Sequence, residues 1–87
     1  MPARAKEAPG PLTQEVAAIL RAELGRLGRS QDELARAVDI SQSQLSKMLR
    51  AERHIDLDQL DRLCHALHLD LARVVHEASR LTEIRLH

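Results

Sequence analysis

The order of apolar and polar residues predicts a chain of short amphipathic helices separated by polar turns. Apolar residues recur three and four positions apart, the spacing of one helix face, in five separate stretches. We expect helices over residues 14–27, 31–38, 42–50, 57–67 and from 71 onward. Each is preceded by a side chain that can accept a hydrogen bond from the first turn, namely Thr13, Ser30, Ser41, Asp56 and Asp70. The pattern predicts an all-α fold.

The second and third of these helices carry matching start signals close together. Ser30 is followed three residues later by Glu33, and Ser41 is followed in the same way by Gln44. Both pairs have the pattern of a capping box. Asp39 falls in the turn between the helices, where a left-handed backbone is needed, and Asp is one of the few residues that tolerate it. Two capped helices joined by a tight turn form the helix-turn-helix unit.

This unit resembles the helix-turn-helix of the Cro and repressor family of phage and bacterial transcriptional regulators. The residues that carry the resemblance are Gln31, Leu34, Ala35, Val38, Ile40, Ser41, Gln42, Leu45 and Ser46. Asp39 is the one departure from the family's usual pattern. The resemblance implies a compact five-helix, lambda-repressor-like domain at residues 12–79 that binds double-stranded DNA. It also implies that Gln31 contacts a backbone phosphate and supports Gln42.

The third predicted helix has a polar face that suits the major groove of DNA. At about 100° per residue, its apolar residues cluster on one side and its polar residues on the other. A glutamine amide can pair with adenine, and lysine or arginine can reach guanine or a phosphate. We expect base readout by Gln42, Ser43, Ser46, Lys47 and Arg50. A merely solvated helix face is the less favoured alternative, because two capping signals stand at helix-turn-helix spacing.

Candidate phosphate contacts surround this helix, since phosphate contacts fix the register of a protein on duplex DNA. They are Gln31, Ser41, Arg29, Arg53 and His54, with Arg36 as a weaker candidate. Residues 1–11 hold all three prolines and show no apolar period, so we expect a disordered arm there. Arg4 and Lys6 in this arm either touch the DNA backbone or belong to an untethered tail.

Composition narrows the classes of function. The chain has no Phe, Tyr or Trp, so it cannot hold single-stranded nucleic acid by stacking bases on aromatic rings. The net charge is zero, but the charges are unevenly distributed. Residues 1–29 carry two more basic than acidic groups, and residues 56–87 carry two more acidic than basic groups. A neutral total can therefore hide a basic face. We expect its field to be weak and DNA binding to be sensitive to salt.

The sequence indicates neither a metal site nor a catalytic site. Cys64, His65 and His68 supply at most three ligands, whereas structural zinc sites use four. No nucleophile stands with a recognisable base. We therefore expect no enzyme activity, no metal and no cofactor. The lone cysteine fits a reducing compartment and no apolar run could span a membrane, so we expect a cytoplasmic protein without a membrane partner.

The C-terminal tail, residues 80–87, has more apolar residues than a five-helix core needs. Thr82, Ile84 and Leu86 alternate with polar residues, which is the period of a strand, so a short strand and a continued helix both remain open. We expect the tail and the preceding helix to form a dimer contact. Its residues are Leu71, Val75, Leu81, Ile84 and Leu86.

The leading hypothesis is a sequence-specific repressor that binds a near-palindromic operator as a homodimer through residues 42–50. Repression would follow because an occupied operator excludes RNA polymerase. The alternative is an antitoxin-type or partner-controlled module that binds DNA while its tail engages another protein, a toxin or a regulator. A stable co-purifying protein would favour the alternative.

Overall fold

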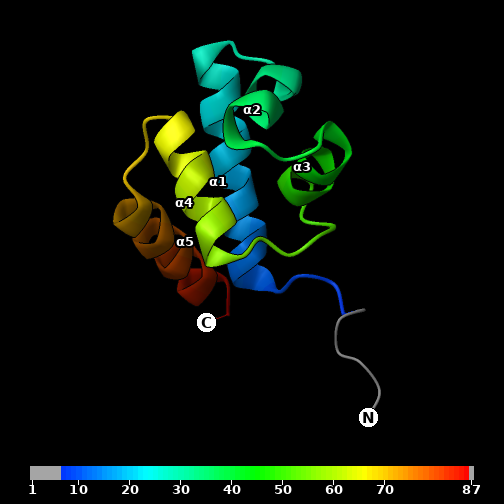
Figure 1. Ribbon diagram of the computed structural model, residues 1–87. Helices are drawn as coiled ribbons and strands as arrows, with labels where there is room; N and C mark the ends of the chain where they lie inside the picture. Colours follow the sequence, from blue (N-terminus) through cyan, green and yellow to red (C-terminus); the bar gives the residue numbers. More distant parts are fainter. Residues whose placement is uncertain (1–6, 87) are drawn as a thin grey trace.

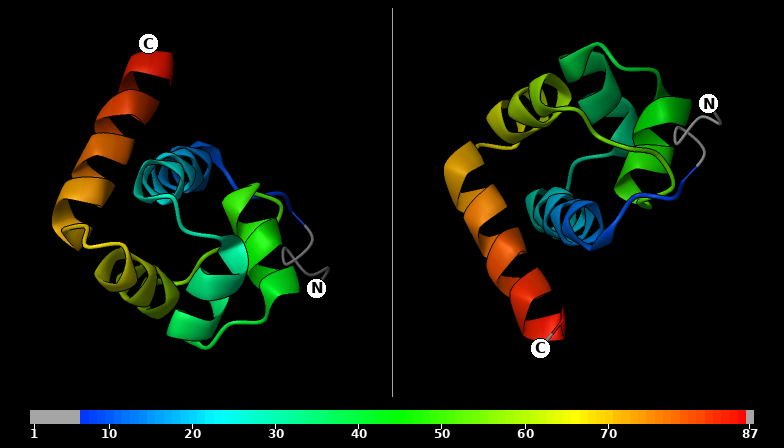
Figure 2. Two further views of the ribbon diagram at one scale, coloured as in Figure 1. Left: turned by 90° about the horizontal axis from the view of Figure 1, so that it is seen from above. Right: turned by 90° about the horizontal axis from the view of Figure 1, so that it is seen from below.

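Five α-helices form the structure around a central first helix. The computed structural model describes residues 7–86, with side chains through Ile84. The helices are α1 (Pro11–Leu27), α2 (Gln31–Val38), α3 (Gln42–Leu49), α4 (Leu57–Ala66) and α5 (Leu71–Leu86) (Figure 1). Seen nearly along α1, the other four helices form an arc around it (Figure 2). The all-α, five-helix prediction is confirmed.

The core is aliphatic, and all five helices contribute to it. α1 packs against α3 and α5, while α2 packs against α3 and α4. The largest fully buried side chains are Leu20, Leu34, Leu45, Met48, Leu49, Leu63, Leu67 and Cys64. Leucine side chains therefore fill the interior where a protein with aromatic residues would use larger groups.

Most of the predicted helix starts are confirmed by side-chain caps. The Ser30 hydroxyl accepts a 3.1 Å hydrogen bond from the Glu33 N–H, and the Glu33 carboxylate accepts one of 2.9 Å from the Ser30 N–H. Asp56 and Gln59 form the same reciprocal pair at α4. Asp70 Oδ1 accepts from the backbone N–H three residues on, at 3.0 Å. At α3 the Ser41 hydroxyl accepts a 3.1 Å hydrogen bond from the Gln44 N–H, but the reciprocal bond of the predicted capping box, present at α2 and α4, does not form between these two residues.

The start of α1 differs from the prediction. The helix begins at Pro11, two residues before the predicted cap Thr13, and Gly10 is its N-cap residue. Proline suits the first helical position, because its fixed φ is already helical and it has no N–H to leave unpaired. The predicted arm over residues 1–11 is therefore too long by at least its last residue. Its first six residues, with Arg4 and Lys6, lie outside the described residues.

The C-terminal tail is helical, so the strand alternative is wrong. α5 continues without a break to Leu86, and the Thr82 hydroxyl donates a 2.8 Å hydrogen bond to the Ala78 carbonyl one turn earlier. A single strand here would have left its backbone groups without partners. A helix pairs them internally and lets α5 lie along α1.

Candidate nucleic-acid interface

The turn between α2 and α3 has the backbone that the sequence predicted. Asp39 adopts the left-handed conformation, with φ 56° and ψ 46°. The Ile40 N–H then donates a 3.1 Å hydrogen bond to the Ala35 carbonyl. The small side chain of Ala35 and that of Ile40 are both buried at this point. These contacts set the angle between the two helices, and the helix-turn-helix geometry follows.

One face of α3 is buried and the opposite face is open to solvent. Leu45, Met48 and Leu49 are completely buried, so the helix cannot rotate without opening the core. Of the predicted base-reading residues, Ser46 is half-buried at the edge. The others are exposed, and they are Gln42, Ser43, Lys47 and Arg50. The structure therefore brings the predicted set together on α3 and on Arg50, the cap residue that directly follows it.

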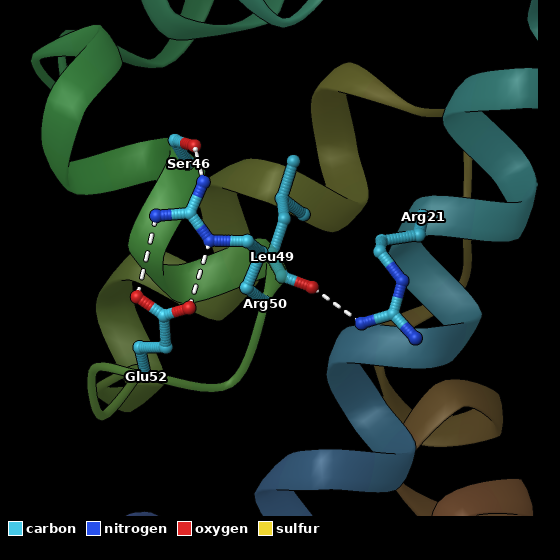
Figure 3. A network of polar contacts seen from close by, with 5 residues as sticks. All are labelled: Arg21, Ser46, Leu49, Arg50 and Glu52. Carbon is cyan, nitrogen blue, oxygen red and sulfur yellow. Dashed lines mark hydrogen bonds and ion pairs between the residues drawn. The ribbon is translucent and has the colours of Figure 1, made fainter.

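The carboxyl end of α3 is fixed by a residue that the sequence did not single out. Arg21 on α1 donates a hydrogen bond from its guanidinium to the backbone carbonyl of Leu49 (Figure 3). The last carbonyls of a helix lack partners within it and carry a partial negative charge. A cation at that position satisfies one of them and ties α3 to α1. An arginine on the polar side of a helix gives no sign of this in the sequence.

Arg50 is engaged within the protein, beside the face that was expected to bind DNA. Its Nε lies 2.9 Å from Glu52 Oε2 and its Nη2 lies 3.2 Å from Glu52 Oε1. Its Nη1 donates a 2.7 Å hydrogen bond to the Ser46 hydroxyl (Figure 3). The side-chain hydrogen bonds lower the pKa of Glu52 and raise the pKa of Arg50 from their ordinary values. Both groups therefore stay charged at neutral pH.

Three of the predicted phosphate contacts have other interactions in the structure. The Ser41 hydroxyl forms the cap of α3. His54 Nε2 lies 3.0 Å from the Glu7 carbonyl oxygen, which ties the segment before α1 to the loop after α3. Arg36 forms an exposed ion pair with Asp32, 2.8 Å long, one turn back on α2.

The three remaining candidates differ in their surroundings. Arg53 is exposed on the loop after α3, while Gln31 is half-buried as the first residue of α2. Arg29 donates a 2.7 Å hydrogen bond from Nη1 to the Ala66 carbonyl at the end of α4. This contact favours a structural role for Arg29 over the predicted phosphate contact.

Comparison with known proteins agrees with this geometry. A family model described as helix-turn-helix, HTH_3, matches residues 20–74. The chain belongs to the Cro/C1-type helix-turn-helix family. Family and fold are those of DNA-binding transcriptional regulators.

Two crystal structures of one regulator share this fold, the clp gene regulator ClgR from Corynebacterium glutamicum. One has a TM-score of 0.72 and 32% identity, and the match covers 78% of this chain and 88% of that chain. The other has a TM-score of 0.78 and 29% identity, covering 92% of this chain and 84% of that chain. The search of curated proteins found no match.

The cysteine and histidine residues that were considered as metal ligands in this helix-turn-helix regulator do not form a metal site in the structure. Cys64 is almost fully buried, and burial raises the pKa of its thiol. Among the described residues, no three His, Cys, Asp or Glu side chains lie close enough to share a metal ion. None of the described helices has the length and apolar character needed to cross a membrane.

The residues predicted to form a dimer contact occupy different environments in this helix-turn-helix regulator. Leu71 and Val75 are half-buried and pack against the core. Leu81 is half-buried, whereas Ile84 is 61% exposed; the Leu86 side chain lies outside the described set. Two further leucines are exposed, Leu12 and Leu57; the spacing of apolar residues in the sequence predicts Leu57 on the apolar face of α4, and that prediction is wrong. With Val75 these two line one small apolar pocket where α1, α4 and α5 meet.

Proposed function

We propose that the protein is a repressor that binds a near-palindromic operator as a homodimer, with α3 in the major groove. The observation that carries the proposal is the exposed polar face of α3 on a helix that cannot rotate. Buried Leu45, Met48 and Leu49 hold that helix, and Arg21 fixes its end. A rigid helix with a polar face is what direct readout of base edges requires.

Within this proposal the side chains of α3 have separate roles. Gln42, exposed in the first turn, pairs with an adenine through its amide. Lys47 and Arg50 supply positive charge toward guanines or phosphates, and Ser43 and Ser46 complete the polar face. Phosphate contacts come from the flanking residues, namely Gln31, Ser41, Arg53 and His54. Arg29 is left out of this set because its guanidinium binds the end of α4.

A homodimer follows from the size of the recognition surface. One copy of α3 can reach only a few base pairs, and one short site gives little discrimination within a genome. Two copies related by a two-fold axis would read two half-sites about one helical turn apart. We place the contact between the copies in residues 71–87, where Ile84 is 61% exposed on α5. RNA polymerase is then excluded from the occupied operator.

A second candidate is a module that binds another protein as well as DNA. Leu12 and Leu57 are exposed at the pocket beside α5, and exposed apolar groups gathered in one place favour a protein contact. A toxin or a regulator seated there would control the DNA-binding helix from outside. Sedimentation of the purified chain separates the two candidates, because the homodimer forms from the chain alone.

Selection of bound fragments from a random duplex library tests the leading proposal. We expect enrichment of an inverted repeat whose half-sites lie about one helical turn apart. Lys47→Ala should weaken binding, while Arg26→Ala, which removes the same charge from the exposed surface of α1, should not. Enrichment of no sequence at modest salt would contradict DNA recognition. Unchanged transcription from a promoter that contains the enriched sequence would contradict repression alone.

A further inference from the structure

Glu52 lies two residues beyond Arg50 and binds it with both carboxylate oxygens. The distances are 2.9 Å from Nε to Oε2 and 3.2 Å from Nη2 to Oε1. The Ser46 hydroxyl takes a 2.7 Å bond from the remaining nitrogen, Nη1 (Figure 3). Every nitrogen of the guanidinium therefore has a partner within the protein. The side chain is held against the exposed face of α3.

The backbone places Glu52 in this position independently of the ion pair. The N–H of Ala51 donates a 3.1 Å bond to the Met48 carbonyl, and the N–H of Glu52 donates a 2.8 Å bond to the Lys47 carbonyl. With Ala51 left-handed at φ 58°, these two bonds form a Schellman motif, which folds the chain back at the end of a helix. The carboxylate is thus returned to α3 by the fold of the loop.

The network leaves part of the guanidinium available. An arginine side chain has five N–H donors, and three of them are used here. Two donors remain, and 54% of the Arg50 side chain is still exposed. Guanine presents two acceptors, O6 and N7, to an arginine in the major groove. A held guanidinium can still bind this pair of acceptors.

An arginine without such a partner would strengthen binding to any sequence. A free guanidinium reaches whichever phosphate is nearest, and each phosphate contact adds affinity that does not depend on the bases. The paired carboxylate neutralises this charge and keeps its position at α3. It also repels the phosphates of any duplex. Glu52 therefore reduces the part of the affinity that carries no sequence information.

We propose that Glu52 is a specificity-determining residue of the interface, which holds Arg50 for base contacts and withholds it from phosphates. The inference rests on the proposed binding of DNA by α3. Without this role, the negative charge of Glu52 beside α3 would only weaken binding to DNA. Glu52 acts through Arg50, so it is a positioning residue and needs no base contact of its own.

The test compares Glu52→Gln with Glu23→Gln, using the full chain. On α1 the Glu23 carboxylate binds Nε and Nη2 of Arg26 with its two oxygens, outside α3 and outside the proposed contact between copies, so its substitution removes the same charge from the same kind of contact. Dissociation constants are measured over a series of salt concentrations for two duplexes. The selected duplex is the one enriched from the random library, and the random duplex has an unrelated sequence of the same length. Thermal melting first shows that both variants fold.

For Glu52→Gln we expect the affinity for random duplex to rise about 1.5-fold to fivefold, the range that an exposed ion pair accounts for. The slope of log K against log salt should steepen by about 0.9, the value for one added phosphate contact. The affinity for the selected duplex should rise less, so the ratio of the affinity for the selected duplex to that for the random duplex should fall. Glu23→Gln should change neither affinity.

The same measurements in an Arg50→Ala background show whether the effect acts through Arg50. There Glu52→Gln should leave the ratio of selected to random affinity unchanged. Equal rises for both duplexes, or a fall in the ratio that persists without Arg50, would overturn the inference and leave DNA recognition standing. Failure of the unmodified chain to prefer the selected duplex would overturn both the inference and the proposed function.

Discussion

Arg29 and Ala66 are joined by a hydrogen bond of 2.7 Å from the arginine Nη1 to the alanine carbonyl oxygen. Arg29 directly precedes the cap of α2, and Ala66 is the last residue of α4. The cation satisfies a carbonyl that has no partner within its own helix and complements the partial negative charge there. The first helix of the DNA-binding unit is therefore attached to α4.

Replacement of Arg29 by alanine should lower the free energy of unfolding by about 1–2 kcal/mol, because a hydrogen bond from a charged donor is lost. The salt dependence of DNA binding should stay the same, since the guanidinium is not offered to a phosphate. Urea denaturation and binding titrations over a salt series measure the two effects. A flatter salt slope with unchanged stability would show instead that Arg29 contacts DNA.

The contrast between local and long-range contacts explains what the sequence could predict. Ser30, Asp56 and Asp39 act within a few residues of their own position, and the structure confirms all three. Arg21 and Arg29 act on carbonyls 28 and 37 residues away. No spacing in the sequence encodes such a partner, because it depends on how finished helices pack.

The wrong start predicted for α1 and the choice left open at the C-terminal tail have different causes. Thr13 has the side chain of a cap, but Pro11 already has a helical φ and begins α1 earlier. The alternation after Ser79 resembles a strand, yet α5 lies along α1 and continues as a helix. Of the interface, the sequence predicted the exposed face of α3. The sequence did not predict the pairing of Arg50 with Glu52, because each residue alone has the character of an ordinary solvent-exposed charge.

Replacement of Gln42 by alanine should weaken binding to the selected duplex by about 1–3 kcal/mol, because one bidentate base contact is lost. Preference should be relaxed at one base pair in each half-site, while binding to random duplex changes little. Lys47→Ala is the matched comparison, because loss of a phosphate contact weakens binding to both duplexes. Competition titrations with single-base variants of the site measure this. Undiminished discrimination would remove Gln42 from base readout.

Asp39 should tolerate glycine but not valine. Its φ of 56° lies in the left-handed region, which glycine enters freely and which costs other residues about 1–2 kcal/mol. Valine is branched at Cβ and should destabilise the protein more than alanine would. Ala51, with φ 58°, provides the matched site, where glycine should raise stability by up to about 1 kcal/mol. Urea midpoints test this, and equal midpoints for Asp39→Gly and Asp39→Val would contradict it.

The capping box of α2 should give the protein an acid-sensitive contribution to stability. The backbone N–H of Ser30, and then its side chain, lower the pKa of Glu33 below its ordinary value of 4.5. A carboxyl whose pKa is lower in the folded state stabilises the fold above its unfolded pKa. That contribution is lost as the pH falls from 4.5 through the lowered native value.

Glu33→Gln removes this titrating group and leaves the backbone unchanged. At neutral pH the variant should be less stable than the unmodified protein. The difference should shrink steadily as the pH falls below 4.5. Urea denaturation at neutral and acidic pH gives the two free energies of unfolding. A difference that stays constant across this range would mean that the carboxylate form of Glu33 adds nothing to the cap.

The last prediction concerns assembly through the end of α5. Val74 and Ala78 are buried against the core, so a chain that ends after Ala78 should keep its first four helices folded. That truncation removes Ile84, which is 61% exposed and does not belong to the buried core of one copy of the chain. Truncated protein should therefore be mostly monomeric, and its affinity for an inverted repeat should fall toward that for a single half-site.

Ile84→Asp tests the same contact without shortening the helix, and Glu83→Gln at the neighbouring exposed position is its control. The aspartate would place a charge in an apolar contact, which costs too much free energy for the dimer to persist. Sedimentation over a range of concentrations measures assembly, and titration of duplexes with one or two half-sites measures its effect on binding. A dimer that survives both the truncation and Ile84→Asp would place the contact elsewhere. Leu57→Ser at the pocket beside α5 would then show whether the copies meet there, because Leu57 is 75% exposed.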